Sequence, residues 1–330
     1  MLAATAPAQA QSQSSWCASG KPVKFAGITW ESGQLLTALM RHVMEHGYGC
    51  KTEEIPGNSV TMEVALSTND VQVFAEEWIG RSEAWNKAAA AGKVKAVGNV
   101  IVGATEGWYV PEYVVKGDAK RNIKPSAPDL KSINDLVRYK QVFKDDEEPG
   151  KGRFLNCPAG WTCEGINTQK LKAYKLGDSY VNFRPGTGAA LDAAIASAVQ
   201  RGKPVLFYYW TPTGLMGKYK FVQLEEGAYD EACYKTLTNK DHATPCGSGS
   251  PDVTIQAGVS SVFHDADPVL VDMLSKFNVP IDLLNQSLSG MADRKMDAKK
   301  TAIAFLKSHP DVWTKWVPAD VAGKVTASLK

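Results

Sequence analysis

The chain has 330 residues, which is long enough for two lobes that each bury a hydrophobic core. With 44% hydrophobic and 22% charged residues, its composition is that of an ordinary globular protein. The formal net charge of +2, from 37 basic and 35 acidic residues, gives no support for binding to nucleic acid or to an anionic membrane surface.

The first residues resemble the end of a secretory signal. Ala8-Gln9-Ala10 has the small-x-small form of a signal-peptidase site, although no basic or long apolar region precedes it. We therefore expect residues 1–22 to consist of an added start methionine, the remnant of a signal peptide and an N-terminal arm. A disordered arm rich in Ala, Gln and Ser is the alternative. The first interpretation predicts a periplasmic protein.

The six cysteines fit an exported protein, because an even number in an oxidising compartment implies disulfides. They fall into local pairs, although about fifteen pairings are formally possible. Proximity alone predicts three bonds: Cys17–Cys50, Cys157–Cys163 and Cys233–Cys246. No Cys-x-x-Cys or His-Glu-x-x-His motif occurs, so the sequence predicts no metal site.

The N-terminal hundred residues alternate strands with helices. Strands are predicted at residues 23–28, 51–55 and 71–75, and helices at residues 34–46 and 59–67. This βαβα order predicts a parallel sheet covered by helices. Ligands of such sheets bind beyond the carboxyl ends of the strands, and Trp30 and Trp78 each follow a strand.

The remainder of the chain continues in the same α/β style. Strands are predicted at residues 99–104, 179–183, 204–212 and 253–263, with a helix at residues 189–201 and Leu/Met-rich helices from residue 268 onward. The acidic run at residues 145–148 is interpreted as a solvated turn, with a calcium ion left open as an alternative.

Residues 156–165 form the most distinctive stretch, because Trp161 lies between Cys157 and Cys163. If these cysteines pair, the small ring holds the indole in one place and directs the N–H groups of residues 162–165 outward. Those amides open a predicted helix and therefore suit an anion such as a carboxylate. An aromatic face beside such a helix start suits a small zwitterion. A surface loop held by a structural disulfide is the alternative.

Aromatic residues recur where strands end: Trp30, Trp78, Trp108 with Tyr109, Trp161, and Tyr208 to Trp210. One such residue alone is more simply a core residue, but five positions in an α/β chain favour a shared cleft. Several ring faces attract a cation that has no N–H to donate, at about 0.5–2 kcal/mol for each contact. No nucleophile with a base, phosphate-binding loop or dinucleotide motif is present, so we predict no catalytic residue and no cofactor.

Two stretches carry a resemblance to a known family. The Cys-x5-Cys ring around Trp161, and Tyr-Tyr-Trp-Thr-Pro at residues 208–212, resemble the glycine-betaine/proline-betaine periplasmic binding proteins of ABC importers. The similarity extends from about Val23 to the C-terminus. It implies a two-lobed α/β fold, type II-like, in which each lobe is a sheet flanked by helices and the ligand occupies the cleft between the lobes.

The resemblance also implies an aromatic box. In that family three tryptophans enclose a trimethylammonium group, and by motif these are Trp78, Trp161 and Trp210, with Trp30, Trp108 and Tyr209 as possible additions. The family's ligand carboxylate is held by main-chain N–H groups just after the loop tryptophan, which here belong to Thr162 and Cys163.

The same resemblance divides the chain into two lobes. Lobe 1 is expected to comprise residues 23–104 plus 259–330, and lobe 2 residues 105–258. Two chain crossings, near residues 103–107 and 256–260, would act as the hinge.

The residues around Trp78 depart from the family pattern. The family's Asn-Trp-Thr-Pro is replaced by Glu-Glu-Trp-Ile-Gly, and its carboxylate-assisting histidine by Ser82, beside Arg81. Arg81 would replace the lost donor and keep a carboxylate ligand, whereas Glu76 or Glu77 would favour a more cationic ligand such as choline, carnitine or a guanidinium compound. Because adjacent residues of a strand point to opposite faces, we expect only one of these glutamates to line the cleft.

We therefore predict an extracytoplasmic solute-binding protein of an ABC importer that captures a quaternary-ammonium compound of the glycine betaine or proline betaine type. Its partners would be this small ligand and a membrane permease, and the protein would be a monomer. Two other classes stay open. One is an enzyme that acts on a methylated amine with Glu76 or Glu77 as base, and the other is a ligand-free sensory or interaction domain.

Overall fold

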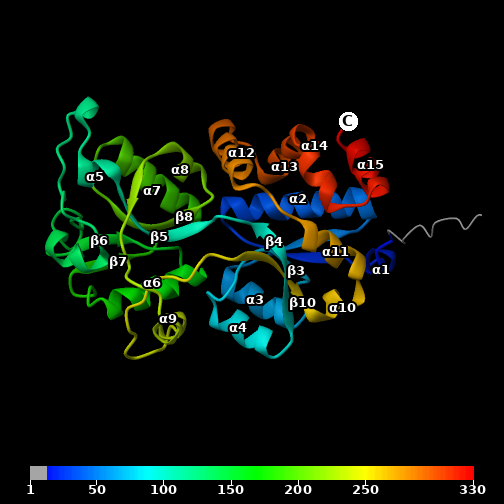
Figure 1. Cartoon of the computed structure of the whole chain (residues 1–330), viewed down its shortest axis with the longest axis horizontal. Coiled ribbons are helices and arrows are strands. Elements are labelled where there is room, and N and C mark those ends of the chain that lie inside the picture. The colour runs from blue at the N-terminus through cyan, green and yellow to red at the C-terminus, as the bar shows by residue number, and fades with distance from the viewer. Residues whose placement is uncertain (1–12) are drawn as a thin grey trace, which may run out of the picture.

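The computed structural model describes residues 13–330, which form two α/β lobes placed side by side (Figure 1). The predicted signal-peptidase site at residues 8–10 lies outside the described residues. Each lobe is built on a five-stranded sheet that has helices on both of its faces. The predicted two-lobed α/β fold is confirmed.

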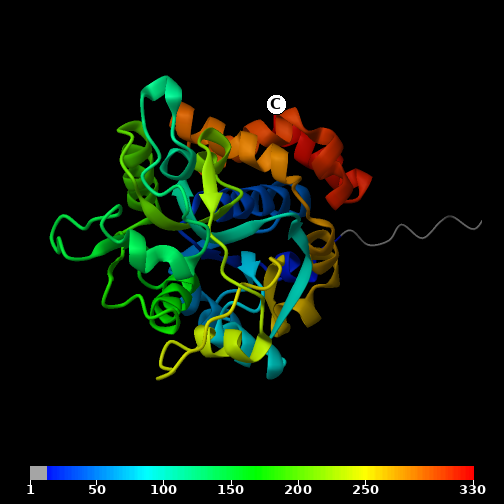
Figure 2. The same ribbon diagram turned by 60° about the vertical axis from the view of Figure 1, so that its left-hand side comes forward.

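The first sheet has the strand order β2-β1-β3-β10-β4. Its strands are β1 Val23–Gly27, β2 Thr52–Pro56, β3 Val73–Trp78, β4 Val94–Ile101 and β10 Ile255–Ser260. The helices of this lobe are α1 Ser15–Ala18, α2 Glu31–Tyr48, α3 Ser59–Ser67, α4 Glu83–Ala90, α10 Ser261–Ala266, α11 Pro268–Lys276, α12 Ile281–Arg294, α13 Ala298–Ser308, α14 Pro310–Trp313, α15 Ala319–Ser328 and the short 3-10 helix Thr314–Trp316. The C-terminal helices stack against α2 on one side of the sheet, whereas α3 and α4 lie on the other (Figures 1 and 2).

The second sheet has the strand order β7-β6-β8-β5-β9. Its strands are β5 Thr105–Pro111, β6 Gly152–Leu155, β7 Tyr180–Phe183, β8 Leu206–Thr211 and β9 Phe221–Gln223. The helices of this lobe are α5 Glu112–Lys116, α6 Thr162–Ala173, α7 Gly188–Gln200, α8 Gly214–Lys218, α9 Glu231–Thr238 and the 3-10 helices Ala119–Arg121 and Ile133–Tyr139.

Both sheets are mixed, whereas the sequence predicted parallel cores. The parallel part is present as β2-β1-β3 in one lobe and β7-β6-β8 in the other. Strands β5 and β10 run antiparallel to their neighbours β8 and β3. The reason is topological: the parallel strands end at the boundary between the lobes, and β5 and β10 begin there because the chain has just crossed from the other lobe.

The chain crosses between the lobes twice (Figure 1). It leaves the first lobe between β4 and β5, at residues 102–104, and returns to the first sheet with β10. Strand β10 begins at Ile255, whereas the sequence placed the crossing near residues 256–260 and the second part of lobe 1 from residue 259 onward. A further contact joins the lobes where α8 packs on α12, including an ion pair of 3.4 Å between Lys218 Nζ and Asp293 Oδ1.

Helix α2 illustrates how each lobe is held together. Its apolar residues recur at helical spacing, and the side chains of Leu35, Leu36, Leu39, Met40 and Val43 are fully buried against the first sheet and the C-terminal helices. All three predicted disulfides are confirmed: Cys17–Cys50, Cys157–Cys163 and Cys233–Cys246.

The acidic run of the second lobe is a closed turn. Asp145 accepts hydrogen bonds from the backbone N–H groups of Glu147 and Glu148 and forms an ion pair with Arg153. Within residues 13–330, no group of three or more His, Cys, Asp or Glu side chains is arranged to hold a metal ion. None of the described helices is both long and apolar enough to cross a membrane.

Candidate functional site

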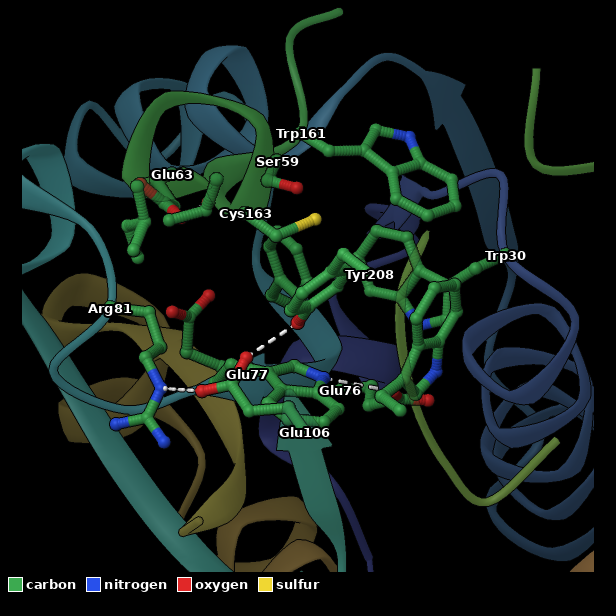
Figure 3. Close-up of a pocket in the computed structure, with 15 residues that line it drawn as sticks. Trp30, Ser59, Glu63, Glu76, Glu77, Arg81, Glu106, Trp161, Cys163 and Tyr208 are labelled. Atoms are coloured by element: carbon green, nitrogen blue, oxygen red, sulfur yellow. Dashed lines mark hydrogen bonds and ion pairs between the residues drawn. The ribbon is translucent and has the colours of Figure 1, made fainter. Parts of the chain in front are cut away.

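A cavity lies between the lobes, near the ends of the parallel strands (Figure 3). One wall comes from the first lobe, through the loop after β1, helix α3 and the end of β3. The other wall comes from the second lobe, through the starts of β5 and α6 and the end of β8. The lining residues are Trp30, Ser59, Glu63, Phe74, Glu76, Glu77, Trp78 and Arg81 of the first lobe, and Glu106, Trp161, Thr162, Cys163, Ile166, Tyr208 and Trp210 of the second.

One end of the cavity is formed by indole rings from three separate segments. The ring centroids of Trp30 and Trp161 are 5.4 Å apart, and those of Trp161 and Trp210 are 5.6 Å apart. The rings are inclined by 69° and 71°, so they meet edge to face. Trp161 Nε1 also donates a hydrogen bond of 3.1 Å to Thr29 Oγ1. Because Trp30 and Thr29 belong to the first lobe, this indole cluster joins the two lobes.

Trp78 continues the aromatic wall from the end of β3. Its Nε1 donates a hydrogen bond of 3.0 Å to Glu76 Oε1, which fixes the orientation of the ring. The cavity therefore brings together the three tryptophans of the expected box, Trp78, Trp161 and Trp210, and adds Trp30 from the set of possible additions.

The other two possible additions do not line this cavity. Trp108 is fully buried in the second lobe, where it stacks on Phe154 at 4.0 Å and donates a hydrogen bond of 2.8 Å to Asn167. Tyr209 donates a hydrogen bond to Asp192. Its neighbours in β8, Tyr208 and Trp210, line the cavity instead. The alternation of side chains along a strand accounts for this difference.

The start of α6 forms part of the wall between the two ends of the cavity. Trp161 occupies the N-cap position, and Thr162 and Cys163 are the first helical residues. The first N–H groups of a helix have no acceptor within the helix, so this wall is a source of hydrogen-bond donors. The disulfide Cys157–Cys163 closes the ring that holds this helix start in place.

Asn156 holds the loop closed by this disulfide through three hydrogen bonds of its side chain. Its Nδ2 donates to the carbonyl oxygen of Glu164 at 3.1 Å. Its Oδ1 accepts from the N–H of Cys157 at 2.7 Å and from Asn167 Nδ2 at 3.0 Å. Since Asn167 is itself bonded to Trp108, the core of the second lobe positions the loop that carries Trp161.

Carboxyl groups gather at the other end of the cavity. Glu63 and Glu77 lie on the side away from Trp30 and Trp161 (Figure 3). Both Glu76 and Glu77 line the cavity, so the expectation that only one of them does is wrong. Two features explain the difference: the cavity wraps around the end of β3, and the neighbouring strand β10 has an irregular register opposite these residues.

These carboxyl groups are almost completely removed from water. Burial raises the pKa of Glu63 and of Glu76 to about 7, because a buried carboxylate loses its hydration. Burial also raises the pKa of Glu77 well above its usual range, and the like charge of Glu63 adds to that shift. Such a site favours either bound protons or a positively charged ligand.

Glu63 is the best satisfied of the three. Ser82 Oγ donates a hydrogen bond to Glu63 Oε2, and Thr162 Oγ1 of the second lobe lies 3.5 Å from Glu63 Oε1. Ser82, an expected ligand-binding residue, does not line the cavity but caps α4 and holds Glu63. Among the described residues, Glu76 Oε2 and Glu77 Oε2 are buried without a hydrogen-bond partner.

Arg81 lines the cavity but is already engaged. Its Nε lies 2.6 Å from Glu106 Oε1, and its Nη2 donates a hydrogen bond of 2.9 Å to the carbonyl oxygen of Pro251. Tyr208 donates a hydrogen bond to the other oxygen of Glu106. The guanidinium therefore neutralises a carboxylate of the protein.

Five lining residues escaped the sequence analysis: Ser59, Glu63, Phe74, Glu106 and Ile166. Phe74 lies in the strand predicted at residues 71–75 and has the even spacing to Trp78 that places two side chains on one face of a strand, so this alternation was an available signal. Glu63 and Glu106 carried no such signal, because a glutamate in a short helix or at the start of a strand is usually solvated.

Residues 21–308 match the family described as the substrate binding domain of ABC-type glycine betaine transport systems. The glycine betaine/proline betaine-binding periplasmic protein of Escherichia coli is 24% identical over 269 residues, which cover 79% of this chain and 78% of that protein. The trimethylamine N-oxide-binding protein of Pelagibacter ubique is 22% identical over 299 residues, which cover 90% of each chain.

A solved structure has the same fold. The glycine betaine/L-proline-binding protein of Borrelia burgdorferi superimposes with a TM-score of 0.72 at 17% sequence identity, covering 92% of this chain and 100% of that one. The family match extends over most of the described chain, and both lobes take part in it. The chain therefore belongs to the family of substrate-binding domains of ABC-type glycine betaine transport systems.

Proposed function

We propose that this protein captures a quaternary-ammonium compound in the interlobe cavity and presents it to the permease of an ABC importer. The observation that carries the proposal is the convergence of Trp30, Trp161 and Trp210 from two lobes on one cavity. Indole faces attract a cation that cannot donate hydrogen bonds. The ligands named for the two sequence relatives, a betaine and trimethylamine N-oxide, both contain a methylated nitrogen.

The site supports a capture mechanism in which the ligand holds the lobes together. Each wall of the cavity belongs to a different lobe, so a bound ligand stabilises the closed arrangement over an open one. The two chain crossings form the hinge in this proposal. The closed pair of lobes is then the surface that a permease recognises.

Two further parts of the proposal concern location and assembly. Three disulfides support an oxidising compartment, and we propose the periplasm. We also propose that the protein works as a monomer, because the two lobes of one chain supply both walls of the cavity.

Calorimetric titration tests the proposal. Glycine betaine, proline betaine, choline and carnitine are titrated into the protein and into Trp161→Ala. We expect heat with at least one compound and a large loss of affinity in the variant. The absence of heat with every compound, or an unchanged affinity in Trp161→Ala, would count against the site.

A binding protein also returns its ligand intact. The competing interpretation is an enzyme that uses Glu76 or Glu77 as a base toward a methylated amine. Mass spectrometry of each compound after long incubation with the protein separates the two. We expect no change in mass, and a demethylated or hydrolysed product would favour the enzyme.

A further inference from the structure

The two ends of the cavity have different chemistry. The indoles of Trp30, Trp161 and Trp210 form one end, and the carboxyl groups of Glu63 and Glu77 lie at the other (Figure 3). A ligand with its methylated nitrogen against the indoles therefore points the rest of the molecule, its tail, toward the carboxyl groups. The inference below deepens the proposed function and rests on it.

The charges around the cavity do not balance. Four carboxyl groups line it, those of Glu63, Glu76, Glu77 and Glu106, and Arg81 is the one basic lining residue. Arg81 is paired with Glu106. Among the described residues, none of the other three carboxyl groups has a cation within ion-pair distance. When these carboxyl groups are ionised, the cavity is complementary to a ligand that brings positive charge into it, and such a ligand in turn favours the ionised form.

Glu77 has the least support of the three. Glu63 accepts hydrogen bonds from two hydroxyl groups, and Glu76 Oε1 accepts from the indole of Trp78. Glu77 is only 2% exposed, lines the cavity, and has a buried Oε2 with no hydrogen-bond partner among the described residues. Buried polar atoms of native proteins are normally satisfied, so this oxygen points to a donor on the ligand.

The rest of the tail site can serve the same group. Thr162 and Cys163 line the cavity at the start of α6, where N–H groups lack helical acceptors. A hydroxyl group both donates and accepts hydrogen bonds, so it satisfies Glu77 and these amides together. A carboxylate accepts from the amides but places a further negative charge beside Glu63 and Glu77.

We infer that the protein selects a ligand with a net positive charge and a tail that donates a hydrogen bond to Glu77, as an ammonium alcohol does, over a zwitterion whose tail is an acceptor. Glu77 is the residue that determines this specificity, and the nearby Glu63 adds negative charge to the tail site. Arg81 does not replace the carboxylate-binding donor that the sequence comparison found missing, because Glu106 already occupies it.

Three probes with the same methylated nitrogen test this inference: choline, glycine betaine and trimethylamine N-oxide, titrated at pH 8 by calorimetry. All three probes place the same trimethylated nitrogen against the indoles, so differences in their affinities arise from the tail. We expect choline to bind at least tenfold tighter than either zwitterion, since a site that hydrogen-bonds a hydroxyl group rejects analogues that lack it.

Glu77→Gln keeps the size of the side chain, removes its charge and adds a donor. We expect this variant to bind choline more weakly and glycine betaine more tightly than the wild type does. The choline-to-betaine affinity ratio should therefore fall at least tenfold. Partial loss of folding would reduce the binding of both ligands, so it cannot lower the choline-to-betaine affinity ratio in this way. Glu54→Gln, a surface carboxyl paired with Arg41, is the control and should keep the wild-type ratio.

The outcomes are distinguishable. Equal or tighter binding of a zwitterion to the wild type, or an unchanged ratio in Glu77→Gln, overturns this inference and leaves the proposed function intact. If Glu77→Gln does not fold, the choline-to-betaine affinity ratios of Glu63→Gln and of the wild type test the inference instead. The absence of heat with all three probes overturns the proposed function and this inference together.

Discussion

Arg81 Nε and Glu106 Oε1 form a buried ion pair of 2.6 Å that connects the two lobes beside the chain crossings. Arg81 follows β3 of the first lobe, whereas Glu106 lies at the start of β5, immediately after the first crossing. The same guanidinium also binds the carbonyl oxygen of Pro251 in the second crossing. One side chain therefore contacts both segments that connect the lobes.

Removing one partner of this pair should be costly. Arg81→Met leaves Glu106 buried without its cation, and such a change costs about 3–5 kcal/mol of unfolding free energy. The double variant Arg81→Met, Glu106→Gln should recover most of that loss, because neither residual group is charged. Urea unfolding of the wild type, both single variants and the double variant measures the coupling. A cost below about 1 kcal/mol for Arg81→Met would show that solvent screens the pair.

The indole cluster predicts a separation of affinity from stability. Trp161→Ala should weaken the tightest ligand at least tenfold, because a desolvated cation–π contact is worth about 2 kcal/mol or more, and about 1.4 kcal/mol is a factor of ten. Trp313→Phe is the matched control, since Trp313 is buried in the core of the first lobe and donates to the carbonyl of Leu306. It should lower Tm and leave affinity unchanged. Equal affinity losses in both variants would contradict the aromatic box.

Gly160 tests whether the closed arrangement is the one that binds ligand. A Cβ at this position would lie 2.6 Å from Asn58 Nδ2, which belongs to the opposite lobe. Gly160→Ala should therefore obstruct closure and reduce affinity by more than its backbone strain explains. Gly227→Ala is the control, because Gly227 has a similar positive φ, +88° against +85°, and open space around it. Both variants should lose about 1–2 kcal/mol of stability, but only Gly160→Ala should lose affinity.

The buried carboxyl groups predict how stability depends on pH. The pKa of Glu76 is raised from 4.5 to about 7, so the folded protein binds more protons than the unfolded chain between these values. The free energy of unfolding therefore falls as pH rises from about 5 to 8. His42, whose pKa burial lowers to about 4, acts in the opposite direction. The difference between the wild type and Glu76→Gln isolates the glutamate.

The measurement is the Tm of ligand-free protein at several pH values. Glu76 faces Trp78, Trp30 and Ser32, and Glu63 and Glu77, whose pKa values are also raised, respond to pH with the same sign. We expect Glu76→Gln to reduce the fall in Tm between pH 5 and pH 8. Each kcal/mol corresponds to roughly 1–2 °C in a protein of 330 residues, because the entropy of unfolding grows with chain length. Parallel Tm profiles for the two proteins would contradict the assigned pKa.

The sequence predicted the aromatic part of the site better than its charged part, for a physical reason. Trp78 and Trp210 lie at the ends of β3 and β8, and Trp161 lies in the loop after β6, and the topology of an α/β lobe brings strand ends to one edge. Trp108 also stands in a strand that begins at this edge, but it lies two residues beyond Glu106 and is covered by α6 and Phe154. Distance from the edge, which the sequence pattern does not give, separates the two cases.

The carboxyl cluster depends on contacts between distant segments. Glu63 is buried and accepts hydrogen bonds from Ser82, at the start of another helix, and from Thr162, in the other lobe. Similarly, the partner of Arg81 lies in the strand after the crossing, so a sequence pattern cannot tell whether the guanidinium is free for a ligand. The disulfides were easier to predict, because each bond joins two cysteines that are consecutive along the chain.

Two of the disulfides should have different consequences when they are removed. Chain-entropy reasoning gives about 4 kcal/mol for a loop the size of Cys17–Cys50 and about 2 kcal/mol for one the size of Cys157–Cys163. Replacing the first pair by serine should therefore cost more stability. Only the second pair closes the ring that carries Trp161 and opens α6, so only its removal should weaken ligand binding. Unfolding and calorimetric titration of both double-serine variants measure the two effects. If the loss of affinity in each variant is proportional to its loss of stability, whichever disulfide is removed, the Cys157–Cys163 ring stabilises the lobe and does not position the indole.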